Sequence, residues 1–199
     1  MLDEESRLSP SGRRRLLLYA LFFEAGLGLL AVLLDRILGA NLLASLGFSA
    51  TSIAVGVIAT VPVTPLLLLL MHGKNASIRR IRKLLERLLL PIAPGLSLPW
   101  ILALSVAAGV GEELLFRGFL QGGVATLLGP GPALIIVSLV FGMLHAVTPA
   151  YAVYATLLGL YLGGLYQLTG SLLVPVVVHA LYDAVGLHSL RSRVHIPSS

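Results

Sequence analysis

Three charged residues inside a long apolar stretch, Glu112, Glu113 and Arg117, have the residue types and spacing for acid–base chemistry. A carboxylate at membrane depth is costly unless it is paired, neutralised or facing water. Glu113 precedes Arg117 by four residues, so on a helix the two share a face and can form an ion pair. Glu112 points about 100° away around the helix axis. The pattern predicts that Glu113 and Arg117 compensate each other, which leaves Glu112 free to act on another group.

Two later apolar segments carry more polar side chains at the same spacing. Phe141 and His145 lie four residues apart, as do His179 and Asp183, so each pair is expected on one helix face. Taken singly, each of these polar groups is compatible with a structural contact between helices. Two histidines and an acid that join two glutamates favour one buried polar site instead.

The composition predicts the elements that position these groups. Of 199 residues, 57% are hydrophobic and 12% are charged, and the mean hydropathy is +0.95, which indicates an all-α, polytopic membrane helical bundle. The chain has no cysteine, which excludes disulfides and thiolate metal sites. The net charge is +5, but the basic residues flank apolar segments, so we expect a lipid bilayer and no nucleic acid as partner.

About six transmembrane spans are expected. They cover residues 16–34, 52–71, 99–122, 132–146, 151–168 and 172–187. The expected regions are an N-terminal cytoplasmic segment at 1–15, two spans at 16–72, a basic linker at 73–97, a core with the polar groups at 98–188 and a cytoplasmic tail at 189–199. Pro62 and Pro65 predict a bend in the second span. Gly159, Gly163 and Gly164 predict a close approach of helices in the fifth.

The linker has a helical alternation of charged and apolar residues between 74 and 90. Its basic residues are Arg79, Arg80, Arg82, Lys83 and Arg87. This pattern predicts a basic amphipathic helix on an anionic membrane surface.

The distribution of positive charge predicts the orientation of the bundle. With both termini in the cytoplasm, the arginines before the first span, the basic linker and the tail arginines lie on one side, as the positive-inside rule requires. At 1.5 Å of rise per residue, His179, Glu112 and His145 then lie roughly 12, 15 and 20 Å below the outer surface. The polar groups therefore fall in one layer near the middle of the membrane.

The three motifs together resemble a known family. The patterns Glu112-Glu113-x-x-x-Arg117, Phe141-x-x-x-His145 and His179-x-x-x-Asp183, in this order on separate spans, resemble those of the CAAX proteases and bacteriocin-processing enzymes, also called the CPBP or ABI family. The resemblance covers roughly residues 98–187. It implies an integral membrane glutamic endopeptidase, expected in the plasma membrane of a prokaryote, which uses no metal or other cofactor.

The resemblance also implies a role for each site residue. Glu112 would be the general base, and with His145 it would hold and activate the attacking water. His179 and Asp183 would stabilise the oxyanion. Supporting roles would fall to Glu113, Arg117 and Phe141. Because an ionised aspartate has no proton to donate, Asp183 would act either in its protonated form or by orienting His179.

Other functions remain open at this stage. Glu112, His145, His179 and Asp183 are all possible zinc ligands, so a zinc-dependent protease is one alternative. A non-catalytic membrane scaffold or bacteriocin-immunity protein is a second, and a proton-coupled transporter is a third. The expected partner of the enzyme is a peptide or protein substrate, and both membrane-bound and prenylated substrates fit. The sequence defines neither the substrate nor the oligomeric state.

Overall fold

A computed structural model describes residues 8–38 and 42–193 of the protein. The helices are α1 (Pro10–Leu38), η2 (Leu42–Leu46), α2 (Ala50–Ala59), α3 (Thr64–His72), α4 (Ala76–Leu89), η3 (Ala93–Gly95), α5 (Leu98–Glu113), η4 (Leu114–Gln121), α6 (Gly122–Leu128), α7 (Pro130–Leu144), α8 (Pro149–Thr169) and α9 (Leu173–Arg193). The described residues contain no β-strand, which confirms the all-α prediction for this part of the chain.

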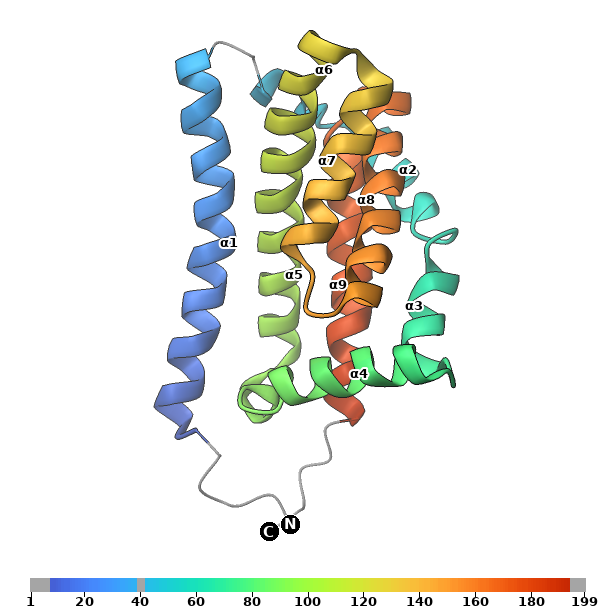
Figure 1. The fold of residues 1–199 in the computed structure, drawn as a ribbon. Helices are drawn as coiled ribbons and strands as arrows, with labels where there is room; N and C mark the ends of the chain where they lie inside the picture. Colours follow the sequence, from blue (N-terminus) through green and yellow to red (C-terminus); the bar gives the residue numbers. More distant parts are fainter. Residues whose placement is uncertain (1–7, 39–41, 194–199) are drawn as a thin grey trace.

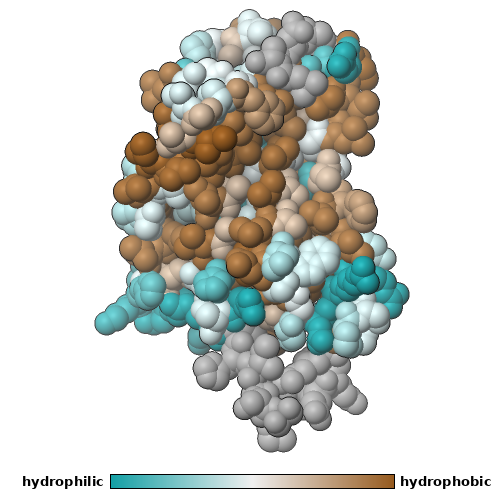
Figure 2. Space-filling model, turned by 180° about the vertical axis from the view of Figure 1, so that it is seen from behind, coloured by the Kyte–Doolittle hydropathy of each residue, from teal (hydrophilic) through white to brown (hydrophobic). Residues whose placement is uncertain are grey.

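Several of these helices have the length and composition of membrane spans. Helices α1 and α9 qualify by themselves, as does the continuous stretch Leu98–Leu128, which runs through α5, η4 and α6. Helices α2 and α3 qualify as one further span, bent by 40° at a short break that contains Pro62, which confirms the predicted bend. Hydrophobic side chains cover much of the middle and upper part of the face that Figure 2 shows. Helix α7 is apolar but shorter, so the total of six spans stays a prediction.

The helices pack side by side around a shared apolar core. Helix α5 lies between α1 and α9, and α7 packs along α8 (Figure 1). The largest buried cluster joins side chains of α3, α4, α5, α8 and α9 with Leu17 of α1. Because α5 and α9 are central in this arrangement, the polar residues that they carry are directed into the protein.

A close approach of α1 and α5 depends on Gly111. A Cβ atom at this position would lie 2.1 Å from the carbonyl oxygen of Glu24, which is backbone and cannot swing away. Gly28, one turn after Glu24, faces the same point, since a Cβ there would lie 3.3 Å from the Gly111 Cα. Gly111 therefore sets the distance between the two helices directly beside Glu112.

The glycines of α8 form a second close contact. A Cβ at Gly159 would lie 3.3 Å from the Ser138 Cα of α7, and one at Gly163 would lie 2.5 Å from the Gln121 side-chain oxygen. The predicted role in helix packing is thus confirmed for these two positions. Gly164 has no neighbouring atom within 4 Å and does not contribute to this contact.

Helix α4 lies across one end of the bundle (Figure 1). Its apolar residues Ile78, Ile81 and Leu89 are buried in the protein core, which confirms the amphipathic pattern. Arg82 donates from Nη1 to carbonyl oxygens at the end of α3, those of Leu70, Met71 and Gly73, at 3.1, 3.0 and 3.3 Å. The apolar face of α4 is therefore used within the protein, and contact of the helix with a membrane surface stays a prediction.

The basic segments gather at the end of the bundle that α4 crosses. Helix α1 begins there and α9 ends there (Figure 1), and hydrophilic side chains collect toward this end (Figure 2). This grouping agrees with the predicted orientation, in which these segments share the cytoplasmic side. The orientation itself stays a prediction.

The contact at Gly111 leads to a test of the fold. We expect Gly111→Ala to destabilise the protein by about 1–3 kcal/mol, because the added methyl group forces α1 away from α5. Gly26→Ala is the matched control, since a Cβ on this exposed α1 residue meets nothing within 4 Å. The thermal unfolding midpoints of the purified proteins in detergent measure the effect. Equal midpoints for both variants would contradict the close approach.

Candidate active site

A fully buried ion pair joins three helical segments. Arg117 donates from Nη1 to Oε1 of Glu113 at 3.1 Å, and the two side chains are only 1% and 0% exposed. This confirms the predicted pair. The second arm of the guanidinium, Nη2, donates to the Gly159 carbonyl oxygen of α8 at 3.2 Å, and the Arg117 Cζ lies 4.6 Å from the centre of the Phe141 ring. The positive charge therefore has a carboxylate, a carbonyl and an aromatic face as neighbours.

The helix around Arg117 is not α-helical throughout. Residues 114–121 form the π-helix η4, a conformation that is rare and is found frequently at functional sites. Its last residue, Gln121, is buried and donates from Nε2 to the Gly163 carbonyl oxygen at 3.1 Å. Gln121 was not among the site residues predicted from the sequence. The sequence feature that could have identified Gln121 is its position four residues after Arg117. This spacing matches the four residues between Gly159 and Gly163, whose carbonyl oxygens accept from Arg117 and Gln121.

Glu113 also positions a histidine of α9. Its Oε1 lies 2.8 Å from Nδ1 of His179, and because an ionised carboxylate only accepts, Nδ1 must carry the proton and donate. This leaves Nε2 of the ring directed toward Asp183 Oδ2 at 3.5 Å and Glu112 Oε2 at 3.9 Å. Since Nδ1 already holds one proton, Nε2 can donate a hydrogen bond only when His179 is the imidazolium ion.

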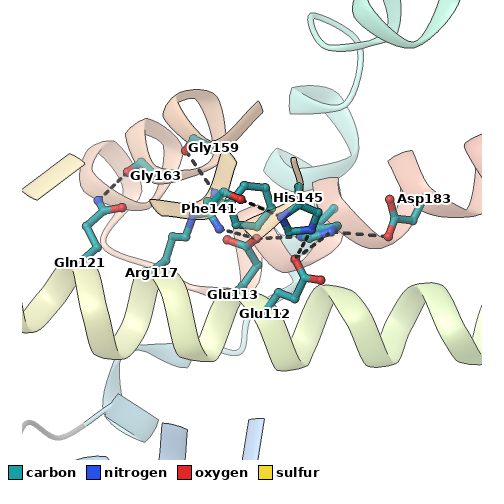
Figure 3. Close-up of polar contacts among 10 residues, drawn as sticks. Glu112, Glu113, Arg117, Gln121, Phe141, His145, Gly159, Gly163 and Asp183 are labelled. Carbon is teal, nitrogen blue, oxygen red and sulfur yellow. Dashed lines mark hydrogen bonds and ion pairs between the residues drawn. The ribbon is translucent and has the colours of Figure 1, made fainter. Parts of the chain in front are cut away.

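Glu112 is not held in this way. Its Oε2 lies 3.7 Å from Nε2 of His145 and 3.9 Å from Nε2 of His179, and this buried oxygen has no hydrogen-bond partner among the described residues. The carboxylates of Glu112 and Glu113 thus face the same group of side chains from α5 (Figure 3). Glu113 accepts two hydrogen bonds at Oε1, although its Oε2 has no partner among the described residues. Glu112 Oε2 has no such partner either, and it lies between two imidazoles.

His145 lies directly after the last residue of α7, not within a longer helix that reaches residue 146. Its backbone has φ −93° and ψ 8°, and its ring stacks on Phe141 with the ring centres 4.3 Å apart. Nδ1 lies 2.8 Å from the Phe141 carbonyl oxygen, which can only accept, so Nδ1 donates. In neutral His145, Nε2 is therefore an acceptor directed toward Glu112.

The exposure of the side chains shows from which side the site is open. The side chains of His145 and Asp183 are 30% and 34% exposed, whereas those of Glu113 and His179 are buried. The groups that fix the geometry are thus enclosed, and a substrate can approach past His145 and Asp183. On the α1 side of α5, an apolar groove of about 710 Å³ reaches Gly111, the neighbour of Glu112 in the chain.

Glu24 of α1 is a further acid close to this group of residues. Its Oε2 is buried without a hydrogen-bond partner among the described residues, and the side chain is close enough to Glu112 for the two charges to interact. Glu24 was not among the site residues predicted from the sequence. The sequence shows Glu24 as an acidic residue within an apolar segment. It does not show that Glu24 lies near Glu112, because residue spacing gives no information on how α1 packs against α5.

A zinc site requires at least three side chains that converge on one metal ion. Within residues 8–38 and 42–193, no three His, Asp or Glu side chains are arranged as the ligands of a metal ion. Glu112, His145, His179 and Asp183 do lie together, as the motifs predicted, but as pairs of side chains at 3.5 to 3.9 Å.

Comparison with known proteins identifies the region that contains this site. Residues 94–185 match the family model described as Type II CAAX prenyl endopeptidase Rce1-like. An uncharacterized protein of Bacillus subtilis (strain 168), YpbD, is 36% identical over 92 residues, which are 45% of this chain and 44% of that protein. The match thus spans less than half the length of this relative. No solved structure matches the chain.

The family match confirms the resemblance that the three motifs predicted. Residues 94–185 match the Rce1-like family model, and all three motifs lie within this region. Together with the apolar helices, this match identifies an integral membrane protein.

The contrast between the two glutamates leads to a stability prediction. We expect Glu113→Gln to destabilise the protein by about 3–5 kcal/mol, because it leaves the buried Arg117 charge without a counter-ion. Glu112→Gln is the matched change, and we expect it to alter stability by less than about 1 kcal/mol, since its Oε2 forms no hydrogen bond. Thermal unfolding in detergent compares the two. If Glu112→Gln lowers the unfolding midpoint as much as Glu113→Gln does, the conclusion that only Glu113 stabilises the buried Arg117 charge is wrong.

Proposed function

We propose that the Rce1-like region works as an intramembrane endopeptidase in which Glu112 activates a water molecule without a metal. The observation that carries this proposal is the position of Glu112 Oε2, a buried acceptor without a partner that faces Nε2 of both His145 and His179. A buried carboxylate that served only to join helices would be expected to accept hydrogen bonds from the groups it joins, as Glu113 does at Oε1 from Arg117 and His179.

The proposed reaction begins with the attacking water. A water molecule between Glu112 Oε2 and His145 Nε2 can donate one proton to each acceptor, which directs an oxygen lone pair toward the substrate carbonyl. As the oxygen attacks the carbonyl carbon, Glu112 takes one water proton and the carbonyl becomes an oxyanion. When the tetrahedral intermediate collapses, Glu112 returns the proton to the leaving nitrogen. The carboxylate is then regenerated, and the products are a carboxylic acid and an amine.

His179 is the proposed donor to the oxyanion. In its imidazolium form it has a proton on Nε2, while Nδ1 stays bonded to Glu113, so the charge and the orientation of the ring are both set by neighbouring groups. Asp183 lies 3.5 Å from this nitrogen. It contributes either as a protonated donor or as a carboxylate that holds the imidazolium, and the substitutions below distinguish these two roles.

The proposed substrate is a peptide bond in a polypeptide that is associated with the membrane. Apolar helices enclose the site on most sides, and the opening lies at His145 and Asp183. The apolar groove between α1 and α5 supports a substrate with an apolar or prenylated segment, in keeping with the CAAX prenyl endopeptidases that the family model describes. We place the enzyme in the plasma membrane of a prokaryote.

The main test is proteolysis by the purified protein in detergent with a broad peptide library. We expect Glu112→Gln to lower the cleavage rate by at least about 100-fold, because an amide cannot accept the water proton. Glu86→Gln, the same change on α4 and away from the site, is expected to cleave like the wild type. We expect a chelator to have no effect.

Three outcomes would contradict this proposal. Equal cleavage by the wild type and the folded Glu112→Gln variant would exclude Glu112 as the base, and the absence of any cleavage would favour a non-catalytic membrane protein. Loss of cleavage with a chelator and its recovery with added zinc would indicate a zinc protease.

Substitutions of Asp183 test how the oxyanion is stabilised. We expect Asp183→Asn to retain cleavage within about tenfold of the wild type, because the amide can donate to the oxyanion, and Asp183→Ala to lose about 100-fold. The cleavage rates of the two variants are compared at equal amounts of folded protein. If Asp183→Asn is as inactive as Asp183→Ala, the negative charge beside His179 is the important property.

A further inference from the structure

The outer face of α4 carries a concentrated positive charge that the proposed reaction does not use. Arg79, Arg80, Lys83 and Arg87 are exposed and follow each other at helical spacing on one face. Together they line a pocket of about 410 Å³. No carboxylate lines it, so the pocket has the charge of an anion-binding site.

These four side chains differ from the fifth basic residue of the helix. Arg82 is directed inward and binds the carbonyl oxygens at the end of α3, so its charge is used by the fold. None of the four forms an ion pair with a carboxylate within residues 8–38 and 42–193. Glu86 is on the same helix but does not line the pocket. Four like charges within nine residues repel each other, and a bound anion would relieve this repulsion.

A second element turns this helix face into a pocket. Thr148, in the loop between α7 and α8, forms part of the wall opposite the cations. Its position is set by α8, because Thr148 Oγ1 accepts a hydrogen bond from the Tyr151 backbone nitrogen at 3.1 Å and caps the helix. The pocket therefore includes one residue of the loop that begins after His145, and the helix cap fixes the position of this residue.

The position of the pocket indicates the source of the anion. Helix α4 crosses one end of a bundle whose long helices are apolar enough to span a bilayer (Figure 1). Apolar side chains also adjoin the cations, since Leu84 lines the pocket and the neighbouring Leu88 is 59% exposed. A site for a soluble anion has no need of exposed leucine, whereas charged headgroups and acyl chains meet at this level of a membrane.

We propose that this pocket between α4 and the α7–α8 loop binds the phosphate of an anionic phospholipid headgroup. Arginine is suited to this ligand because its guanidinium forms two parallel hydrogen bonds to phosphate oxygens. The proposal does not depend on proteolysis, since the pocket contains no residue of the candidate active site.

The test is lipid binding to the full-length protein in neutral detergent, measured by native mass spectrometry. The probes are phosphatidylglycerol and phosphatidylcholine with identical acyl chains, so that only the headgroup charge differs. The pocket variant is Arg80→Gln with Lys83→Gln. Its matched control is Arg191→Gln with Arg193→Gln, which removes the same charge from exposed residues at the same end of the bundle but outside the pocket.

We expect the wild type to prefer phosphatidylglycerol, and the pocket variant to bind it about 30-fold more weakly. The control variant should bind like the wild type. Phosphatidylglycerol should also raise the thermal midpoint of the wild type and the control more than that of the pocket variant. Because all four substituted side chains are exposed, both variants are expected to fold.

Three results would overturn the proposal. Equal weakening in both variants would mean that total charge, and not the pocket, attracts the lipid. No preference for phosphatidylglycerol over phosphatidylcholine would exclude an anionic headgroup. Displacement of the lipid by an equal concentration of inorganic phosphate would identify a site for free phosphate instead.

Discussion

The arrangement of the site depends on one constraint, the burial of the Glu113 and Arg117 charges between apolar helices. Neither charge can stay there alone, and together they require further hydrogen bonds to compensate for the loss of water. Glu113 obtains these from Arg117 and from His179 of α9. Arg117 adds the Gly159 carbonyl oxygen of α8 and the ring of Phe141 on α7. Satisfying a single ion pair thus ties together the elements that carry all three motifs.

This constraint explains why two adjacent glutamates have different properties. The carboxylate that compensates Arg117 is poorly placed to act as a base, because its side chain is completely buried and its Oε1 already accepts from Arg117 and His179. Glu112 is held at the same depth by the same backbone but does not share these bonds. A reactive carboxylate in an apolar bundle is costly, and the neighbouring ion pair provides nearby positive charge and a fixed position for it.

The sequence predicted the local contacts of the site well. The pairs Glu113 with Arg117 and His179 with Asp183 lie on one helix each, where the four-residue spacing determines which side chains meet. The helices, the bend near Pro62 and the helix contacts of Gly159 and Gly163 were predicted for similar reasons. All of these depend on periodicity or on the steric properties of proline and glycine.

Features that depend on tertiary packing could not be predicted in this way. The bond from His179 to Glu113 joins residues 66 positions apart, and nothing in the spacing of either motif specifies it. The π-helix is one such feature, because it arises where Arg117 and Gln121 both reach carbonyl oxygens of α8. The burial of the apolar face of α4 is another, since the same pattern would suit a membrane surface equally well.

The bonding of His145 differs from that of the other site residues in a way that bears on the reaction. Glu113, Arg117 and His179 are buried and joined by short hydrogen bonds, so they form a rigid unit. His145 instead follows the end of α7, and its ring is held by Phe141 through stacking and one hydrogen bond. A small movement of this partly exposed ring can change the 3.7 Å distance to Glu112 without breaking a buried bond. The site thus combines a rigid support for the carboxylate with an adjustable second acceptor, an arrangement that suits the proposed reaction, in which a water molecule and a substrate must enter while the buried charges stay compensated.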